Sequence, residues 1–466
     1  MNKKVFLLSP NSVDELNPNL IAYSMALGYL GAYAEKAGWE PVVRDCYCSD
    51  WENTKKQILD VIKKEKPSVV GINCITMNRF AAYNSIDLIK KIDQKIIILV
   101  GGVHPTIFPE HFLINHAADI VVMHEGEETF EELLKKFSKD DLLKAKSLKN
   151  IRGIAYKENG QVKINLQRKQ IENLDSMPFM KHDFFMNKDS TKAYFFSSRG
   201  CPNNCSFCSA SIHWGRMWRF RSPEKVVDEI EQVVKKYPKV NEIRFMDDTF
   251  TLNNQRVIDI CKEMIKRNIQ VKWRCSGRVF PVSLEMLKWM EKAGCIMVSF
   301  GVETGSTKLL QEIGKNQTID QIYNAFKLVY ENTKITPEMF FIIGFPNEDK
   351  TTIWETIILI KKIIDVSKKP LILTAARMLE IYPGTRIYDL AKNKGMIDDN
   401  YWLSNPKTPI YLEKSESWLK KQRNRILYAN WTYAGFLPVV KLFIEKKMWK
   451  PRKIYNIIRP YLTGLN

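Results

Sequence analysis

Short apolar runs alternate with amphipathic segments through most of this 466-residue chain, and this alternation constrains the fold more than any other feature. A short apolar run bounded by turn residues is typical of a buried parallel strand, and helical spacing between such runs predicts βα units. Five such units before residue 140 predict a doubly wound, Rossmann-like sheet, whose ligands bind beyond the carboxyl ends of its strands. The expected strands lie at 5–8, 41–45, 68–73, 96–100 and 119–123.

A second series of six apolar runs begins after residue 190. Six βα units match a partial barrel that is open on one side better than a complete barrel of eight strands. Because barrel active sites lie at the carboxyl ends of the strands, polar residues at those ends are candidates for function. The expected strands lie at 193–197, 242–246, 271–275, 296–300, 339–343 and 373–379.

The two series divide this α/β chain into four expected regions. Residues 1–140 form the first domain and 191–400 the partial (β/α)6 barrel. A linker at 141–190 separates them, and a small helical region rich in basic and aromatic residues follows at 401–466. Within the linker, Asn159-Gly160 predicts the type I′ turn of a hairpin that straps the domains together.

The formal net charge of +19 is unevenly distributed along the chain. With 13 basic and 3 acidic side chains, residues 401–466 supply ten of these charges. This concentration argues against nucleic acid as the partner. It fits either a solvated helical face or attraction to an anionic membrane surface or acidic substrate, as in peripheral membrane contact.

Nine cysteines, only three of them closely spaced, fit a reducing cytosol better than a disulfide framework. The amino terminus has too short an apolar run for a signal peptide, and no run of about 18 apolar residues predicts a spanning helix. We therefore expect a cytoplasmic protein.

The closely spaced cysteines are Cys201, Cys205 and Cys208, which follow the first barrel strand in a C-x3-C-x2-C pattern. Three thiolates are one fewer than a closed zinc site or a four-cysteine cluster uses. An iron–sulfur cluster held by three cysteines keeps one iron open, so a small molecule with an amine and a carboxylate can chelate it. Zinc is the alternative, with His213 as its fourth ligand.

The strand ends of the first domain carry Gly101, Gly102, His104, Glu125 and Glu127. No G-x-G-x-x-G follows the first strand and no P-loop occurs, which removes the main support for a dinucleotide site. Paired glycines let a backbone approach a bulky, flat ligand closely, although they also suit a tight strand-to-helix turn.

The segments NPNLIAYSMALGYLGAYAEKAGWE, LVGGVHPTIFPE and ADIVVMHEGEETFEELL resemble the cobalamin-binding domain that precedes radical S-adenosylmethionine (SAM) catalytic domains. The resemblance implies a corrinoid against the strand ends, near the five residues just named. The D-x-H-x-x-G motif that supplies a cobalt ligand in other corrinoid proteins is absent, which leaves His104 as a candidate ligand or a turn residue. Three further cysteines, Cys46, Cys48 and Cys74, are either buried small side chains or ligands of a second cluster.

The later part of the chain resembles the radical SAM superfamily, and the cysteine loop is its most specific signature. The resemblance implies that Cys201, Cys205 and Cys208 bind a [4Fe–4S] cluster, beside which Phe207 borders the adenine of SAM. It also places Asp247 and Asp248 near the methionine amino group. The ribose and methionine carboxylate are assigned to Ser276, Arg278 and Glu303.

The two resemblances together predict a cobalamin-dependent radical SAM enzyme, which generates a 5′-deoxyadenosyl radical. The leading outcome is methylation of an unactivated carbon of a small-molecule or lipid-like substrate, with flavodoxin or ferredoxin as electron donor. One alternative is an oxidative cyclase or rearrangement enzyme of the anaerobic magnesium-protoporphyrin ester cyclase type. Another is a corrinoid- or surface-binding protein with a structural cluster and no catalysis.

Overall fold

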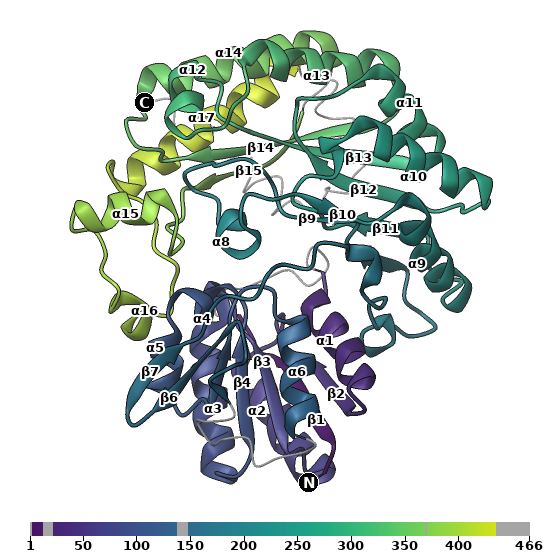
Figure 1. Ribbon diagram of the computed structural model, residues 1–466. Helices are drawn as coiled ribbons and strands as arrows, with labels where there is room; N and C mark the ends of the chain where they lie inside the picture. Colours follow the sequence, from purple (N-terminus) through teal and green to yellow (C-terminus); the bar gives the residue numbers. More distant parts are fainter. Residues whose placement is uncertain (1, 13–21, 138–147, 369–370, 435–466) are drawn as a thin grey trace. The chain divides into compact units, whose positions relative to one another are not determined.

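The computed structural model describes residues 2–12, 22–137, 148–368 and 371–434 (Figure 1). The start of the expected linker at 141–147 and the expected carboxyl-terminal region beyond residue 434 lie outside the described residues. Two compact units make up the chain, and each is described by itself. The first consists of Met1–Pro202, Cys208–Val240 and Ile381–Pro409, and the second of Asn203–Phe207, Asn241–Glu380 and Ile410–Asn466.

A seven-stranded sheet in the order β2-β1-β3-β4-β5-β6-β7 forms the centre of the first unit. Strands β1 to β5 pair in parallel, and each lies where the apolar runs predict it. With β1 between β2 and β3, the sheet is doubly wound, which confirms the Rossmann-like prediction. The parallel strands are β1 (Lys4–Ser9), β2 (Glu40–Asp45), β3 (Val69–Asn73), β4 (Ile97–Gly101) and β5 (Ile120–Val122).

Both faces of this sheet are covered by helices. Val5 and Leu7 of β1 face one hydrophobic core, whereas Phe6 and Leu8 face the other, because side chains alternate along a strand. Helices α1 and α6 lie side by side on the first face, and α2 and α3 contact each other on the second (Figure 1). The helices are α1 (Met25–Lys36), α2 (Trp51–Glu65), α3 (Arg79–Ile92), α4 (Val103–Ile107), α5 (Pro109–Leu113) and α6 (Glu127–Phe137).

The predicted hairpin is formed by β6 (Ile154–Glu158) and β7 (Gln161–Ile164). Its turn has φ of 50° at Asn159 and 79° at Gly160, as a type I′ turn requires. Strand β6 also pairs antiparallel with β5, so the hairpin extends the first sheet. The sequence interpretation treated the hairpin as a strap between domains and did not predict that it joins the first sheet.

The second sheet has six strands in the order β15-β14-β13-β12-β11-β8. Neighbouring strands from β11 to β15 pair in parallel and in sequence order, as in a partial barrel, which confirms the predicted fold class. The strands are β8 (Lys192–Phe195), β11 (Glu242–Phe245), β12 (Lys272–Gly277), β13 (Cys295–Glu303), β14 (Thr336–Ile343) and β15 (Ile372–Met378).

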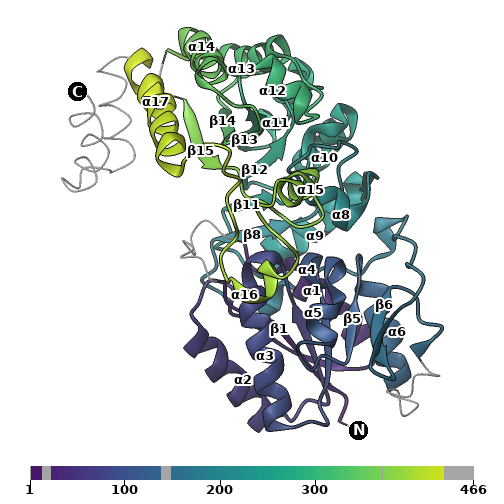
Figure 2. The same ribbon diagram turned by 90° about the vertical axis from the view of Figure 1, so that its left-hand side faces the viewer.

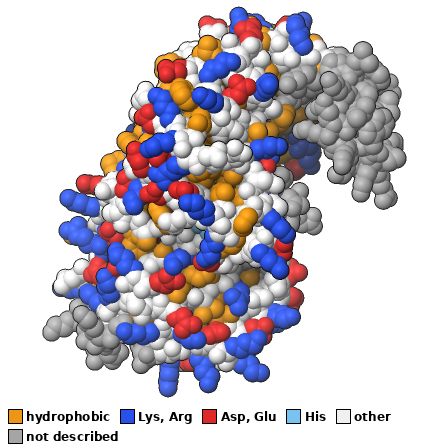
Figure 3. Space-filling model, turned by 90° about the vertical axis from the view of Figure 1, so that its right-hand side faces the viewer, with side chains coloured by type: hydrophobic (Ala, Val, Ile, Leu, Met, Phe, Trp, Pro, Cys, Tyr) orange, Lys and Arg blue, Asp and Glu red, His pale blue; other side chains and the backbone are white. Residues whose placement is uncertain are grey.

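Helices of the second unit cover the outside of these strands. Helix α17 packs against α14 and also contacts β15 (Figure 2). The principal helices are α10 (Asn254–Lys266), α11 (Leu284–Lys292), α12 (Thr307–Glu312), α13 (Ile319–Asn332), α14 (Lys350–Ser367) and α17 (Glu416–Ala434). None of the helices in the described part of the chain is long and apolar enough to cross a membrane. On the face drawn in Figure 3, basic and acidic side chains are interspersed.

Candidate functional site: the cysteine loop and the strand ends

The cysteine loop is closed at its base by a short pair of antiparallel strands. Strand β9 (Ser198–Arg199) precedes the cysteines, β10 (Arg219–Phe220) follows them, and Arg199 lies opposite Arg219. Gly200 has φ of 87°, and a Cβ there would lie 2.1 Å from the carbonyl oxygen of Met217. Only glycine fits so close an approach of two backbones. The base of the loop is therefore tightly packed.

The three cysteines of the loop suit an iron–sulfur cluster. Cys201, Cys205 and Cys208 are partly exposed, and none forms a disulfide. Thiolates are the ligands that such clusters use, and three of them within one loop match the expected donor set. The loop passes from the first unit to the second at Asn203 and returns at Cys208.

A buried network of charges holds the base of the loop. The two guanidinium nitrogens of Arg199 lie 2.5 Å from Glu125 and 2.6 Å from Glu127, and Arg219 lies 2.8 Å from Glu125. All four side chains are buried. Burial by itself would raise the pKa of Glu125, but Arg199 and Arg219 outweigh it and lower the pKa. Glu125 is consequently a carboxylate at neutral pH.

These contacts locate two residues that the sequence assigns to cobalamin. Glu125 follows β5 and Glu127 begins α6, so both stand at the carboxyl edge of the first sheet. Their carboxylates bind arginines from the base of the cysteine loop, and contact with a corrinoid stays a prediction. Sequence reasoning missed the arginine partners, because no local pattern joins residues 74 positions apart.

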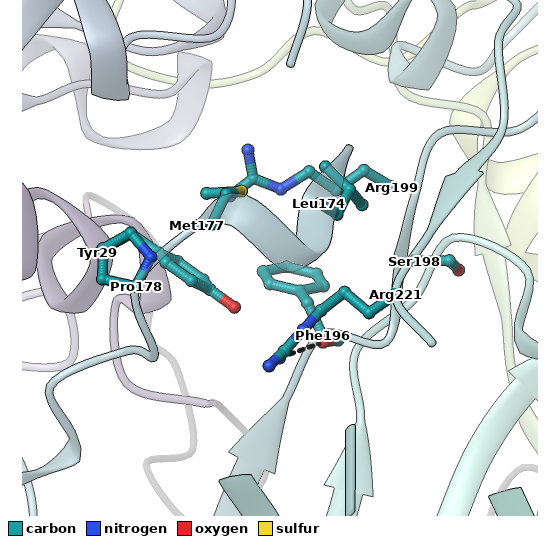
Figure 4. A pocket seen from close by; sticks show the side chains of 8 residues that line it. All are labelled: Tyr29, Leu174, Met177, Pro178, Phe196, Ser198, Arg199 and Arg221. Carbon is teal, nitrogen blue, oxygen red and sulfur yellow. Dashed lines mark hydrogen bonds between the residues drawn. The ribbon is translucent and has the colours of Figure 1, made fainter. Parts of the chain in front are cut away.

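Arg199 is also held by two aromatic rings. Its guanidinium lies 5.1 Å from the ring centres of both Tyr29 and Trp214, within the range of cation–π attraction. Figure 4 shows Arg199, Arg221 and Tyr29 around a small internal cavity of about 10 Å³, which is the size of one water molecule. Arg221 donates to the Phe196 carbonyl at 3.3 Å and forms an ion pair with Glu229. Ring contacts and ion pairs therefore hold both arginines at the base of the loop.

The paired glycines after β4 meet a neighbouring strand end. A Cβ on Gly102, where φ is 116°, would lie 2.2 Å from the carbonyl oxygen of Cys74. A Cβ on Gly101 would lie 3.4 Å from the carbonyl oxygen of Val122. Close packing of the backbone thus explains the glycine at position 102. This is the tight-turn alternative that the sequence offered beside close approach of a ligand.

His104 lies fully buried behind these glycines. Its Nδ1 lies 3.4 Å from the hydroxyl of Thr76, and its Nε2 lies 3.4 Å from that of Tyr83. Burial lowers the pKa of His104 well below its usual value, so the ring is neutral. Both ring nitrogens already have hydroxyl partners, and a role as cobalt ligand stays a prediction.

The sequence also named Cys46, Cys48, Cys74 and His213 as alternative metal ligands. Cys46 and Cys74 are buried and Cys48 is exposed. Burial lowers the pKa of His213 to about 4, and its ring packs edge-on against Trp214. In the described ranges, no group of three or more His, Cys, Asp or Glu side chains is arranged to hold a single ion.

In the second unit, two predicted SAM ligands are joined by a lysine. Glu303 ends β13 and forms a buried ion pair of 2.7 Å with Lys315. Arg278, which follows β12, donates to the carbonyl oxygens of Lys315 at 2.6 Å and Asn316 at 3.0 Å. Sequence reasoning found Arg278 and Glu303 at strand ends but missed Lys315, which follows α12 and not a strand.

The remaining predicted SAM ligands also lie at strand ends. Asp247 and Asp248 follow β11, where the first side chain is buried and the second exposed. Ser276 lies near the end of β12 and is partly buried. The carboxyl ends of adjacent parallel strands thus carry the polar residues that a barrel active site requires.

Phe207 packs against the loop that follows β14. Its ring centre lies 5.6 Å from that of Phe345. Behind Phe345, the buried carboxyl group of Glu348 accepts a hydrogen bond of 2.5 Å from the Gly344 amide. Burial raises the pKa of Glu348 to about 7. Sequence reasoning missed Glu348. The one clue in the sequence is that Glu348 comes four residues after Gly344, the glycine that follows β14.

Family models match both parts of the chain. The Radical SAM superfamily model matches residues 195–360, and the B12 binding domain model matches residues 16–134. An uncharacterized methyltransferase of Pyrococcus horikoshii is 35% identical over 355 residues, which cover 75% of this chain and 74% of that protein. An anaerobic magnesium-protoporphyrin IX monomethyl ester cyclase of Rubrivivax gelatinosus is 32% identical over 343 residues, which cover 71% of this chain and 60% of that protein.

Two solved structures share the fold. A radical SAM methyltransferase, TsrM, from Kitasatospora setae with tryptophan and a SAM analogue bound has a TM-score of 0.67 at 16% identity, covering 84% of this chain and 76% of that one. The cobalamin-dependent radical SAM enzyme OxsB with aqua-cobalamin bound has a TM-score of 0.73 at 22% identity, covering 91% of this chain and 66% of that one.

Proposed function

Because this chain belongs to the family of radical SAM enzymes that carry an amino-terminal cobalamin-binding domain, we propose that it methylates an unactivated carbon of a small-molecule or lipid-like substrate. The observation that carries the proposal is the order of parts. A cobalamin domain precedes a six-stranded sheet whose first strand leads into three cysteines, and polar residues follow the next three strands. The relative from Pyrococcus horikoshii, which matches 75% of this chain, bears the name methyltransferase.

The residues divide into three groups in this proposal. Cys201, Cys205 and Cys208 hold the [4Fe–4S] cluster. SAM is bound by Phe207, Asp247, Asp248, Ser276, Arg278 and Glu303, and cobalamin lies over Gly101, Gly102, His104, Glu125 and Glu127. When bound, these cofactors supply one-electron reduction, radical formation and methyl transfer, while the protein binds and orients them and excludes water.

Charge supports this arrangement of SAM ligands. Arg278 offers a positive charge to the methionine carboxylate, and Lys315 binds both Arg278, through its carbonyl oxygen, and Glu303, through its side chain. Burial of all three side chains strengthens each interaction because little water screens it. We therefore assign orientation of the methionine end of SAM to this group.

The test is anaerobic turnover with SAM labelled in its methyl group. A labelled product together with 5′-deoxyadenosine is expected from candidate substrates under strong reductant. Replacement of Cys201, Cys205 and Cys208 by alanine should abolish both products and the roughly four irons per chain. Cofactor-loaded protein that never cleaves SAM would instead indicate a binding protein with a structural cluster.

Cyclisation or rearrangement is the second candidate. It is favoured by the 32% identity to the magnesium-protoporphyrin ester cyclase, although this chain covers 60% of that relative. A confirmed product that lacks the methyl label would support cyclisation and refute methylation.

The proposal also covers the electron donor and the place of the protein in the cell. We propose flavodoxin or ferredoxin as the electron donor, no nucleic-acid partner, and a cytoplasmic site with peripheral membrane contact. Support for that contact comes from exposed Trp354 and Ile358 on α14 and exposed Tyr428 and Tyr433 on α17, with Lys361 5.4 Å from the ring of Tyr433. Sedimentation with anionic vesicles tests it, and binding should weaken as salt rises.

A further inference from the structure

We infer that the base of the cysteine loop, formed by β9, β10 and residues 215–218, and an adjacent basic groove form the docking surface for a small, acidic one-electron carrier protein. The inference rests on the proposed function, because that reaction requires an electron. The basic groove has a volume of about 530 Å³ and is lined by Arg152, Arg168 and Lys169 together with the carboxylates of Glu128 and Glu172. All residues of this surface belong to the first unit.

The surface reaches the first cluster ligand through one residue. Met217 is 49% exposed, yet its carbonyl oxygen packs against Gly200, the neighbour of Cys201 in the chain. Arg216, beside Met217, is also exposed. A protein that covers the Met217 side chain therefore lies beside the segment whose backbone packs against the neighbour of Cys201. An electron carrier needs such a short route between its surface and the cluster.

The basic groove is a neighbour of the same loop. Arg219, at the foot of the loop, donates at 2.6 Å to the carbonyl oxygen of Ile171, which lines the groove. The side-chain nitrogen of Gln170 lies 3.6 Å from the position that a Cβ on Gly215 would take. These two contacts join the groove wall to the segment that carries Arg216 and Met217. The groove therefore adjoins the segment that carries Arg216 and Met217.

The charges of this surface match an acidic partner. Arg168 pairs with Glu132, whereas Lys169 and Arg216 are exposed and pair with no carboxylate of the described residues. Their charges are available to steer a negatively charged protein toward the loop. Met217 adds an apolar contact. Electron-transfer complexes are weak and bury less than about 1,200 Å², so a surface of this modest size suffices.

A nucleic acid or an anionic bilayer is a poorer match for the basic groove. Glu128 and Glu172 line it and would repel closely spaced phosphates. An acidic protein can place its carboxylates opposite the cations and avoid the two glutamates. The mixed charge thus favours a protein partner.

The experiment uses the reconstituted full-length chain and compares two reductants, reduced flavodoxin and dithionite. In the variant Lys169→Glu/Arg216→Glu, the rate of cluster reduction by flavodoxin should fall by about tenfold or more, and its dependence on salt should weaken. The rate with dithionite, a small molecule that needs no docking surface, should stay unchanged. The neutral variant Lys169→Gln/Arg216→Gln should show a smaller fall with flavodoxin.

The matched control is Lys56→Glu/Lys95→Glu, which makes the same change of charge elsewhere on the first unit. Both lysines are exposed, on α2 and just before β4. Flavodoxin should reduce this control as fast as the unmodified protein. Equal rates in control and test variants would overturn the inference, as would an equal loss with dithionite, which would indicate a damaged loop. Loss of vesicle or oligonucleotide binding with unchanged electron transfer would also overturn it.

The same measurements separate this inference from the proposed function. Cluster reduction is followed by the loss of visible absorption and does not require cleavage of SAM. A chain that accepts electrons from flavodoxin through this surface but never cleaves SAM would refute the proposed function and retain the docking surface. A chain that methylates its substrate with dithionite, but whose rate of reduction by flavodoxin does not depend on Lys169 and Arg216, would retain the proposed function and refute the docking surface.

Discussion

Replacement of Glu125 by glutamine leaves two buried guanidinium groups with fewer negative partners. Arg219 loses its carboxylate partner and keeps its bond to a carbonyl oxygen, whereas Arg199 keeps its ion pair with Glu127. Removal of one partner from a buried ion pair costs about 3–5 kcal/mol. We expect about 3 kcal/mol, because the glutamine oxygen still accepts a hydrogen bond. For a unit of this size that loss lowers the melting temperature by about 6–12 °C.

Thermal unfolding followed by circular dichroism measures the effect, with iron per chain after anaerobic reconstitution as a second readout. The exposed neighbour Glu128 supplies a matched control, since Glu128→Gln removes one charge from the same segment. The double variant Glu125→Gln/Arg219→Met should regain part of the lost stability, because it also removes the unpaired buried cation. Equal melting temperatures for Glu125→Gln and Glu128→Gln would refute the reasoning.

The effect of Glu125 should also depend on pH. Its pKa is lowered in the folded protein from the usual 4.5, so its stabilising contribution is present above that value. The contribution disappears as the pH falls through the folded pKa and the carboxylate is protonated. The difference in free energy of unfolding between the unmodified protein and Glu125→Gln should therefore shrink below about pH 4.5.

Three further predictions concern other parts of the molecule. Gly102→Ala should lower the free energy of unfolding in urea by about 2–4 kcal/mol, because a Cβ would meet a backbone carbonyl oxygen at 2.2 Å. Gly160→Ala is the control: its φ is 79° but the space around it is open, so the loss should be about 1 kcal/mol. Glu348→Gln should gain stability relative to the unmodified protein as the pH rises from 4.5 through 7, by up to about 3 kcal/mol, because the raised pKa makes ionisation of the buried glutamic acid unfavourable; a pH-independent difference in urea unfolding would contradict this. Lys315→Met should weaken SAM binding by about tenfold or more in equilibrium dialysis, since it leaves the Glu303 carboxylate buried without its cation; unchanged affinity would contradict this.

Local patterns in the sequence determined the strands and the cysteine loop. The eleven apolar runs coincide with strands β1 to β5 and with the six strands of the second sheet, because buried strands are rich in apolar residues. The turn at Asn159-Gly160 was also predictable, since positive φ at two successive residues selects those types. The spacing of Cys201, Cys205 and Cys208 indicated a cluster, because short-range spacing limits how ligands surround a metal.

Tertiary structure alone decided which distant residues meet. Glu125 had a predicted role at the cobalamin site, and only folding brings it from the end of β5 to Arg199 at the base of the cysteine loop. Lys315 and Glu348 belong to no motif, and their burial beside Glu303 and the Gly344 amide gives each its importance. The physical reason is common to all of them. The effect of a buried charge depends on the groups around it, and those groups come from parts of the chain that only folding brings together.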